Sequence, residues 1–166
     1  MKYIWQYLES EPKTIFAGLR CFLFWFAACV LYMHFIVLNN CRVIGFRPVN
    51  FWAILLFVYI ALVEEAFNRA MPFFLVYIFT EEKKKYFKPF IIFALIFFSA
   101  ALFGFLHQYH FINILYKGVG GLILGIVYLK FGGIRGKIIK PYLICAAVHW
   151  IYNILMTSLI YVKISG

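Results

Sequence analysis

The chain has 166 residues, of which 66% are apolar, 22% aromatic and only 13% charged, and its mean hydropathy is +0.91. This composition excludes a soluble globular domain and indicates an integral membrane protein. The formal charge of +10 does not indicate nucleic-acid binding, because most lysines and arginines fall in short segments between apolar runs, the distribution that fixes membrane orientation.

The apolar runs predict an all-α fold, a polytopic transmembrane helical bundle of about five spans, with residues 1–166 forming a single domain. Residues 1–14 read as a short amphipathic lead-in whose aromatic residues suit the membrane interface. The predicted spans cover residues 15–38, 51–79, 89–106, 111–128 and 141–162.

The second predicted span contains three charges, in the sequence Glu64-Glu65-Ala66-Phe67-Asn68-Arg69. Insertion of a charged residue near the bilayer centre costs at least about 2.5–3.5 kcal/mol, so such residues are expected to be paired and to have a function. Glu65 and Arg69 are four residues apart and can pair along the helix. Glu64 has no basic residue at that spacing, which favours a reactive carboxylate; the alternative is a buried ion cluster that only fixes packing. Pro72 predicts a kink close to this site.

The later spans contribute further polar groups. The third span ends at Phe103-x-x-x-His107, and the segment of residues 80–88 before it is a charged, solvated turn. The fourth holds Lys117, which can form an ion pair with one of the acidic residues. It also has a GxxxG spacing at Gly121 and Gly125 that permits close helix packing. Between the fourth and fifth spans, residues 130–140 form a basic loop. The fifth span places His149 and Asn153 one turn apart on one face.

These groups are the parts of an amide hydrolase inside a bundle that excludes bulk water. A carboxylate and a histidine that converge on one water form a general base. A second histidine and an asparagine on one face supply donors for a developing oxyanion. We interpret any helical spacing between a histidine and a serine or cysteine of a span as accidental, which disfavours a covalent nucleophile.

Three ordered motifs, Glu64-Glu65-x-x-x-Arg69, Phe103-x-x-x-His107 and His149-x-x-x-Asn153, resemble those of the CAAX protease and bacteriocin-processing family of intramembrane proteases. The resemblance covers residues 64–153 and implies an all-helical fold with a site in a cavity. It implies that Glu64 activates water with help from His107, that His149 and Asn153 stabilise the oxyanion, and that Glu65, Arg69 and Phe103 support them.

The resemblance implies a membrane-associated peptide or protein substrate beside the surrounding lipid. The chain is shorter than the prenyl-protein enzymes of the family, which favours a short bacterial-type member. We expect no obligatory metal, although Glu64, His107 and His149 are a candidate zinc ligand set without the HExxH spacing. Two other functions remain open: a non-catalytic scaffold or bacteriocin self-immunity protein of this fold, and a small proton-coupled transporter.

The distribution of basic residues predicts the orientation. If the N terminus is cytoplasmic, ten lysines and arginines lie in cytoplasmic segments and three on the opposite side. The positive-inside rule therefore predicts a cytoplasmic N terminus, in what we expect to be the bacterial inner membrane.

Overall fold

A computed structural model describes residues 2–38, 41–80, 87–107 and 111–163 of the chain. The long helices coincide with the predicted spans, except that the last one ends earlier, and this helical content confirms the all-α membrane fold. Residues 81–86 of the predicted charged turn lie outside the described residues. The helices are α1 (Lys2–Glu9), α2 (Ile15–Leu38), α3 (Phe51–Glu65), a π-helix (Ala66–Ala70), α4 (Met71–Thr80), α5 (Phe87–His107), α6 (Phe111–Lys130), a short 3-10 helix (Gly133–Arg135) and α7 (Ile139–Ser158).

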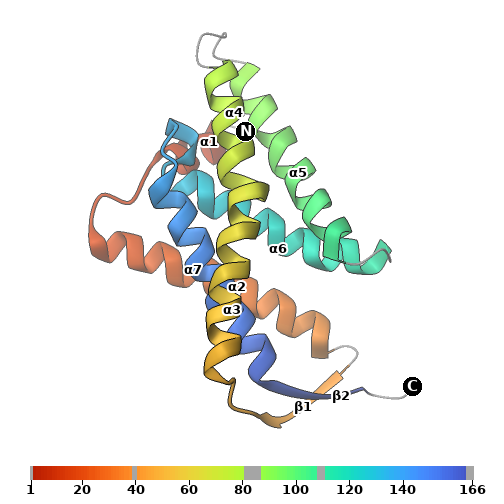
Figure 1. The fold of residues 1–166 in the computed structure, drawn as a ribbon. Helices are drawn as coiled ribbons and strands as arrows, with labels where there is room; N and C mark the ends of the chain where they lie inside the picture. Colours follow the sequence, from red (N-terminus) through yellow and green to blue (C-terminus); the bar gives the residue numbers. More distant parts are fainter. Residues whose placement is uncertain (1, 39–40, 81–86, 108–110, 164–166) are drawn as a thin grey trace.

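The longest element is the rod formed by α3, the π-helix and α4, which runs from one end of the molecule to the other (Figure 1). Helix α7 packs beside α3, and α5 packs along α6. In Figure 1, α2 and α6 run across the rod at steep angles. Among the described residues, Phe51–Phe79 and Ile139–Ser158 are the two segments long and apolar enough to cross a membrane by length and composition. The crossing of all five helices remains a prediction.

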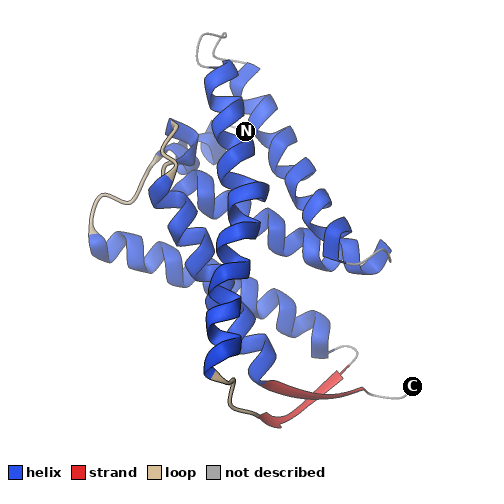
Figure 2. Ribbon diagram, viewed as in Figure 1, coloured by secondary structure: helices blue, strands red, loops and turns tan. Residues whose placement is uncertain are grey.

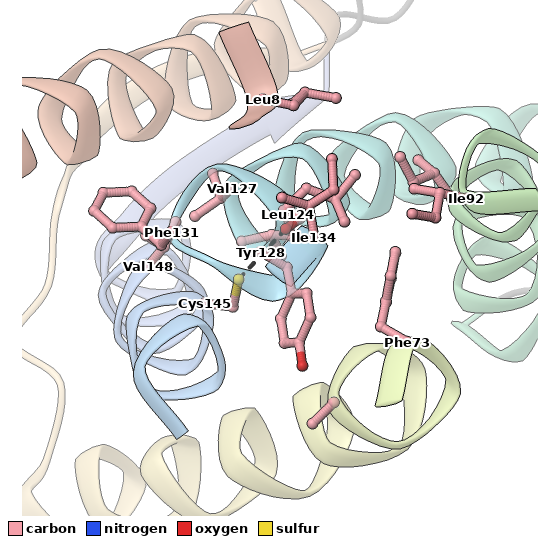
Figure 3. Close-up of a cluster of buried hydrophobic side chains, with 13 residues drawn as sticks. Leu8, Phe73, Ile92, Leu124, Val127, Tyr128, Phe131, Ile134, Cys145 and Val148 are labelled. Carbon is pink, nitrogen blue, oxygen red and sulfur yellow. Dashed lines mark hydrogen bonds between the residues drawn. The ribbon is translucent and has the colours of Figure 1, made fainter. Parts of the chain in front are cut away.

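The buried apolar core lies where α6 meets α4, α5 and α7. Tyr128 of α6 is 1% exposed and packs against Phe73 of α4, with ring centroids 5.0 Å apart. Cys145 of α7 donates its thiol to the carbonyl oxygen of Leu124, as the dashed line in Figure 3 shows. Helix α6 therefore holds the rod, α5 and α7 together.

Three glycines of α6 set its distance from α5. A Cβ added at Gly118 or Gly121 would come within 3.2 Å of the backbone of Ala100, and one at Gly125 within 3.3 Å of Ile96. The predicted packing role of Gly121 and Gly125 is confirmed, because only residues without a side chain permit this approach without a shift of the neighbouring atoms.

The prediction that the last helix continues through residues 159–162 is wrong. The helix ends at Ser158, and Leu159–Lys163 forms strand β2, which pairs antiparallel with β1 (Cys41–Phe46) at one end of the molecule (Figure 2). Residues of β2 are rich in β-branched and aromatic types that favour extended backbone. Arg47, the residue after β1, donates its backbone N–H to the carbonyl oxygen of Ser158 and its Nε–H to that of Thr157, and so satisfies two carbonyls that the ending helix leaves unpaired.

The predicted basic loop at residues 130–140 begins with a buried lysine. Lys130, the last residue of α6, is 5% exposed, and its Nζ donates to the carbonyl oxygen of Tyr7 at 2.6 Å and to the carbonyl and hydroxyl oxygens of Ser10. The ammonium also lies 3.9 Å from the centre of the Tyr7 ring. Tyr7 lies in the last turn of α1 and Ser10 directly follows it, at the end of a helix where carbonyl groups are left unpaired. Lys130 therefore fastens the N-terminal segment to the bundle.

Candidate active site

The site begins at the π-helix in the central rod. Pro72 has no backbone N–H to donate to the carbonyl of Asn68, and its ring disfavours a regular helix there. The hydroxyl of Ser99 in α5 donates to that Asn68 carbonyl instead. The helix is irregular just before Pro72, where Ala66–Ala70 forms a π-helix, a feature that often accompanies functional sites, and the predicted kink remains a prediction.

Glu65 and Arg69 form the predicted ion pair, with both side chains fully buried. Arg69 Nη1 donates to Glu65 Oε1 at 2.5 Å, and Nη2 donates to the carbonyl oxygen of Gly121 at 3.2 Å. The guanidinium also lies 5.1 Å from the ring centre of Phe103. The pair thus joins the rod to α5 and α6.

His149 lies between the two glutamates. Its Nδ1 is 2.9 Å from Glu65 Oε1, and its Nε2 is 3.6 Å from Glu64 Oε2. Because a carboxylate oxygen only accepts, the hydrogen on Nδ1 points to Glu65, and this fixes Nε2 toward Glu64. Phe103 contacts the imidazole edge to face, with centroids 5.8 Å apart. The contact between His149 and Glu65 was not predicted, because no local spacing links residues 84 positions apart.

The two glutamates differ in exposure, and the difference separates their roles. The side chain of Glu65 is 0% exposed, whereas that of Glu64 is 26% exposed. Glu64 lines a cavity of about 350 Å³ between the rod, α5, α6 and α7. The cavity is lined by Phe57, Ile60, Glu64, Phe103, Lys117, Gly120, Leu124, Val148, His149, Tyr152, Asn153, Met156 and Thr157.

The structure therefore brings Glu64, His149, Asn153 and Phe103 to one cavity, as predicted, together with Lys117. Tyr152 and Thr157 also line it and were not predicted, because a hydroxyl in an apolar helix carries no sequence signal of its own. His107 is the last residue of α5, one turn beyond Phe103, and its side chain lies outside the described residues. Its predicted place at the site remains a prediction.

A family model for Rce1-like proteins, the type II CAAX prenyl endopeptidases, matches residues 46–155. The chain belongs to this Rce1-like family. The match extends from the end of β1 through most of α7 and includes Glu64, Glu65, Arg69, His149 and Asn153. Rce1-like proteins form a family of membrane-embedded CAAX-type endopeptidases. No curated protein and no solved structure matches the chain.

Two members of the predicted zinc ligand set, Glu64 and His149, are neighbours in this Rce1-like chain. Within the described ranges, no group of three or more histidine, cysteine, aspartate or glutamate side chains is placed to hold a metal ion. Glu64 and His149 supply two neighbouring ligand groups, and the side chain of His107, the third in the predicted set, is outside those ranges. Zinc chemistry needs three protein ligands and an open position. The expectation of no obligatory metal stays a prediction.

Proposed function

We propose that this protein is an intramembrane endopeptidase that hydrolyses a peptide bond in a membrane-associated peptide or protein, using a water activated by Glu64. The observation that carries the proposal is the placement of Glu64 Oε2 3.6 Å from His149 Nε2 at the wall of a largely apolar cavity. This separation exceeds a direct hydrogen bond, and Glu64 Oε2 itself is buried, so we propose that the water reaches the carboxylate from the cavity, whose wall the partly exposed Glu64 side chain lines.

In the proposed reaction, Glu64 accepts a proton from water as the water oxygen attacks the carbonyl carbon of the substrate. Asn153 and His149 donate hydrogen bonds to the oxygen that becomes negative, and His107 assists the water. In its imidazolium form His149 donates from both ring nitrogens, to Glu65 through Nδ1 and to the oxyanion through Nε2. Glu64 then passes its proton to the leaving nitrogen, so the peptide bond breaks with no covalent enzyme intermediate.

The cavity walls support a substrate with apolar side chains. Phe57, Ile60 and Met156 line the cavity along with the polar groups. A lipid-facing location admits a peptide that partitions into the membrane, and the apolar walls bind its side chains while excluding bulk water. We propose that the enzyme lies in the bacterial inner membrane, and the distribution of basic residues supports a cytoplasmic N terminus.

The test is cleavage by the purified full-length protein of two peptides in detergent, one prenylated at a C-terminal CAAX cysteine and one unmodified and hydrophobic. Glu64→Gln keeps the shape of the side chain and removes the base, so cleavage should fall at least about 100-fold. Thermal stability in detergent should stay close to that of the wild type. A chelator in the wild-type assay tests the metal expectation, which predicts undiminished cleavage.

Three outcomes would decide against the proposal. If Glu64→Gln cleaves as well as the wild type, the carboxylate is not the base. If the wild type cleaves neither peptide nor a hydrophobic peptide library, a scaffold or immunity protein is the better interpretation. If Glu64→Gln abolishes proton flux in proteoliposomes and the wild type shows no hydrolysis, the protein is a transporter.

A further inference from the structure

A second cavity lies apart from the candidate active site, at the end of the molecule where α2 and α7 begin. Its volume is about 420 Å³, within the range of roughly 300–1,000 Å³ typical of ligand sites. It shares no lining residue with the first cavity. The second cavity is lined by Pro12, Lys13, Thr14, Gly18, Leu19, Phe22, Phe131, Lys140 and Ile144.

The polar and apolar lining residues come from different parts of their elements. Lys13 and Thr14 directly precede α2, and Lys140 is in the first turn of α7. Leu19 and Phe22 lie one and two turns into α2, and Ile144 lies one turn beyond Lys140. Since α7 is long and apolar enough to cross a membrane, its first turn belongs at the membrane–water interface. The second cavity is thus a groove with cations at its entrance and apolar side chains within.

The charge around this groove favours an anion. Residues 9–14 and 130–140 together contain five basic residues and two acidic ones. Glu11 binds Lys137 and Lys140 at 2.7 and 2.5 Å. An ammonium has three N–H donors, and the contact with Glu11 uses one of those of Lys140. The side chain of Lys140 remains 49% exposed, so its other donors are accessible.

We propose that this groove binds an anionic phospholipid, whose phosphate contacts Lys13, Lys140 and Thr14 and whose acyl chain lies along Leu19, Phe22 and Ile144. The mixed lining decides the occupant: lysines at a membrane surface attract anionic headgroups, and apolar side chains bind hydrocarbon. A soluble phosphate compound would leave the apolar walls exposed.

The test is native mass spectrometry of the full-length protein in detergent, titrated with phosphatidylglycerol or with phosphatidylcholine. Phosphatidylglycerol should bind more tightly. Lys140→Gln and Lys13→Gln should each lower the affinity for phosphatidylglycerol about five-fold, which is the loss expected when one lysine beside an anionic headgroup is removed. Lys137→Gln is the matched control, because Lys137 also binds Glu11 but does not line the groove. It should leave the affinity unchanged.

A further variant tests the apolar part of the groove without a change of charge. A Cβ at Gly18 makes only ordinary contacts, at 3.9 Å from Phe131 and 4.0 Å from Pro12, so the backbone there accepts a Cβ, and thermal unfolding of the variant checks the larger side chain. Gly18→Leu should fill the groove and weaken phosphatidylglycerol binding. Unchanged binding in this variant would overturn the proposed acyl site.

Three other outcomes would overturn the proposal. One is equal binding of the two lipids. Another is an equal loss in Lys137→Gln and Lys140→Gln, which would show a diffuse attraction to the basic surface. The third is full competition by glycerol phosphate, which would show a phosphate site that makes no use of the hydrocarbon walls.

Discussion

Two clusters of charge hold this protein together, one inside the bundle and one at the end where α1 meets the basic segment. In the first, Glu65 and Arg69 are fully buried, and each reaches other elements. In the second, Glu11 contacts Arg135, Lys137 and Lys140, whose side chains are about half exposed. When one member of a buried ion pair is removed, the charge of the other stays buried without a counter-charge. When one member of an exposed pair is removed, water and neighbouring charged side chains solvate the other. The interior cluster therefore depends on every member, and the surface cluster is redundant.

The largest expected effect is that of Glu65→Gln. The variant leaves the Arg69 guanidinium buried beside a neutral amide, which should lower the free energy of unfolding by about 3–5 kcal/mol. Thermal unfolding in detergent measures the loss. Glu64→Gln, whose side chain faces the cavity, is the control and should unfold close to the wild-type temperature. If Glu64→Gln unfolds the protein and Glu65→Gln does not, the two carboxylates have the opposite roles.

An intermediate effect is expected for Lys130→Met, which tests the one strongly buried cation of the N-terminal contact among the described residues. The change removes hydrogen bonds from an ammonium to the carbonyls of Tyr7 and Ser10, and such bonds contribute roughly 1.5–3 kcal/mol. Limited proteolysis should show faster cleavage in residues 1–14. Lys137→Met removes an exposed lysine and should leave the cleavage rate unchanged. Equal rates in all three proteins would contradict the assigned role of Lys130.

The smallest effect is expected for Glu11→Gln, at about 0.2–1 kcal/mol for each surface pair. Burial raises the pKa of Glu11, but hydrogen bonds and attraction from Lys137 and Lys140 lower it more, so its pKa lies below the ordinary value. The contribution of Glu11 to stability is then complete above the unfolded-state pKa and is lost as the pH falls through the lowered folded-state pKa. Unfolding measured from pH 7 to pH 3 should show the wild type and Glu11→Gln converging at low pH. A gap that stays constant over this range would contradict the ion-pair origin.

The sequence predicted the helices and much of the site because both depend on local patterns. Long apolar runs specify membrane helices whatever they pack against, and a charge among them is conspicuous. Glu64, His149 and Asn153 were therefore found from their surroundings alone. The contact of His149 with Glu65, the pairing of β1 with β2 and the burial of Lys130 each join residues more than 80 positions apart. Nothing in a local pattern encodes such contacts. The sequence around a lysine at the end of a helix is the same whether its ammonium donates to water or to a backbone carbonyl.

The π-helix at Ala66–Ala70 also decides which way the two halves of the rod face. One residue added to an α-helix turns everything beyond it by about 100° around the axis. On the N-terminal side of the π-helix, Glu65 points to His149 of α7. On its C-terminal side, Phe73 packs on Tyr128 of α6. Deletion of one residue from this segment would remove the added residue and rotate Phe73 away from Tyr128, while both glutamates keep their direction. The irregular turn thus lets one helix serve two neighbours that a regular one could not reach with the same side chains.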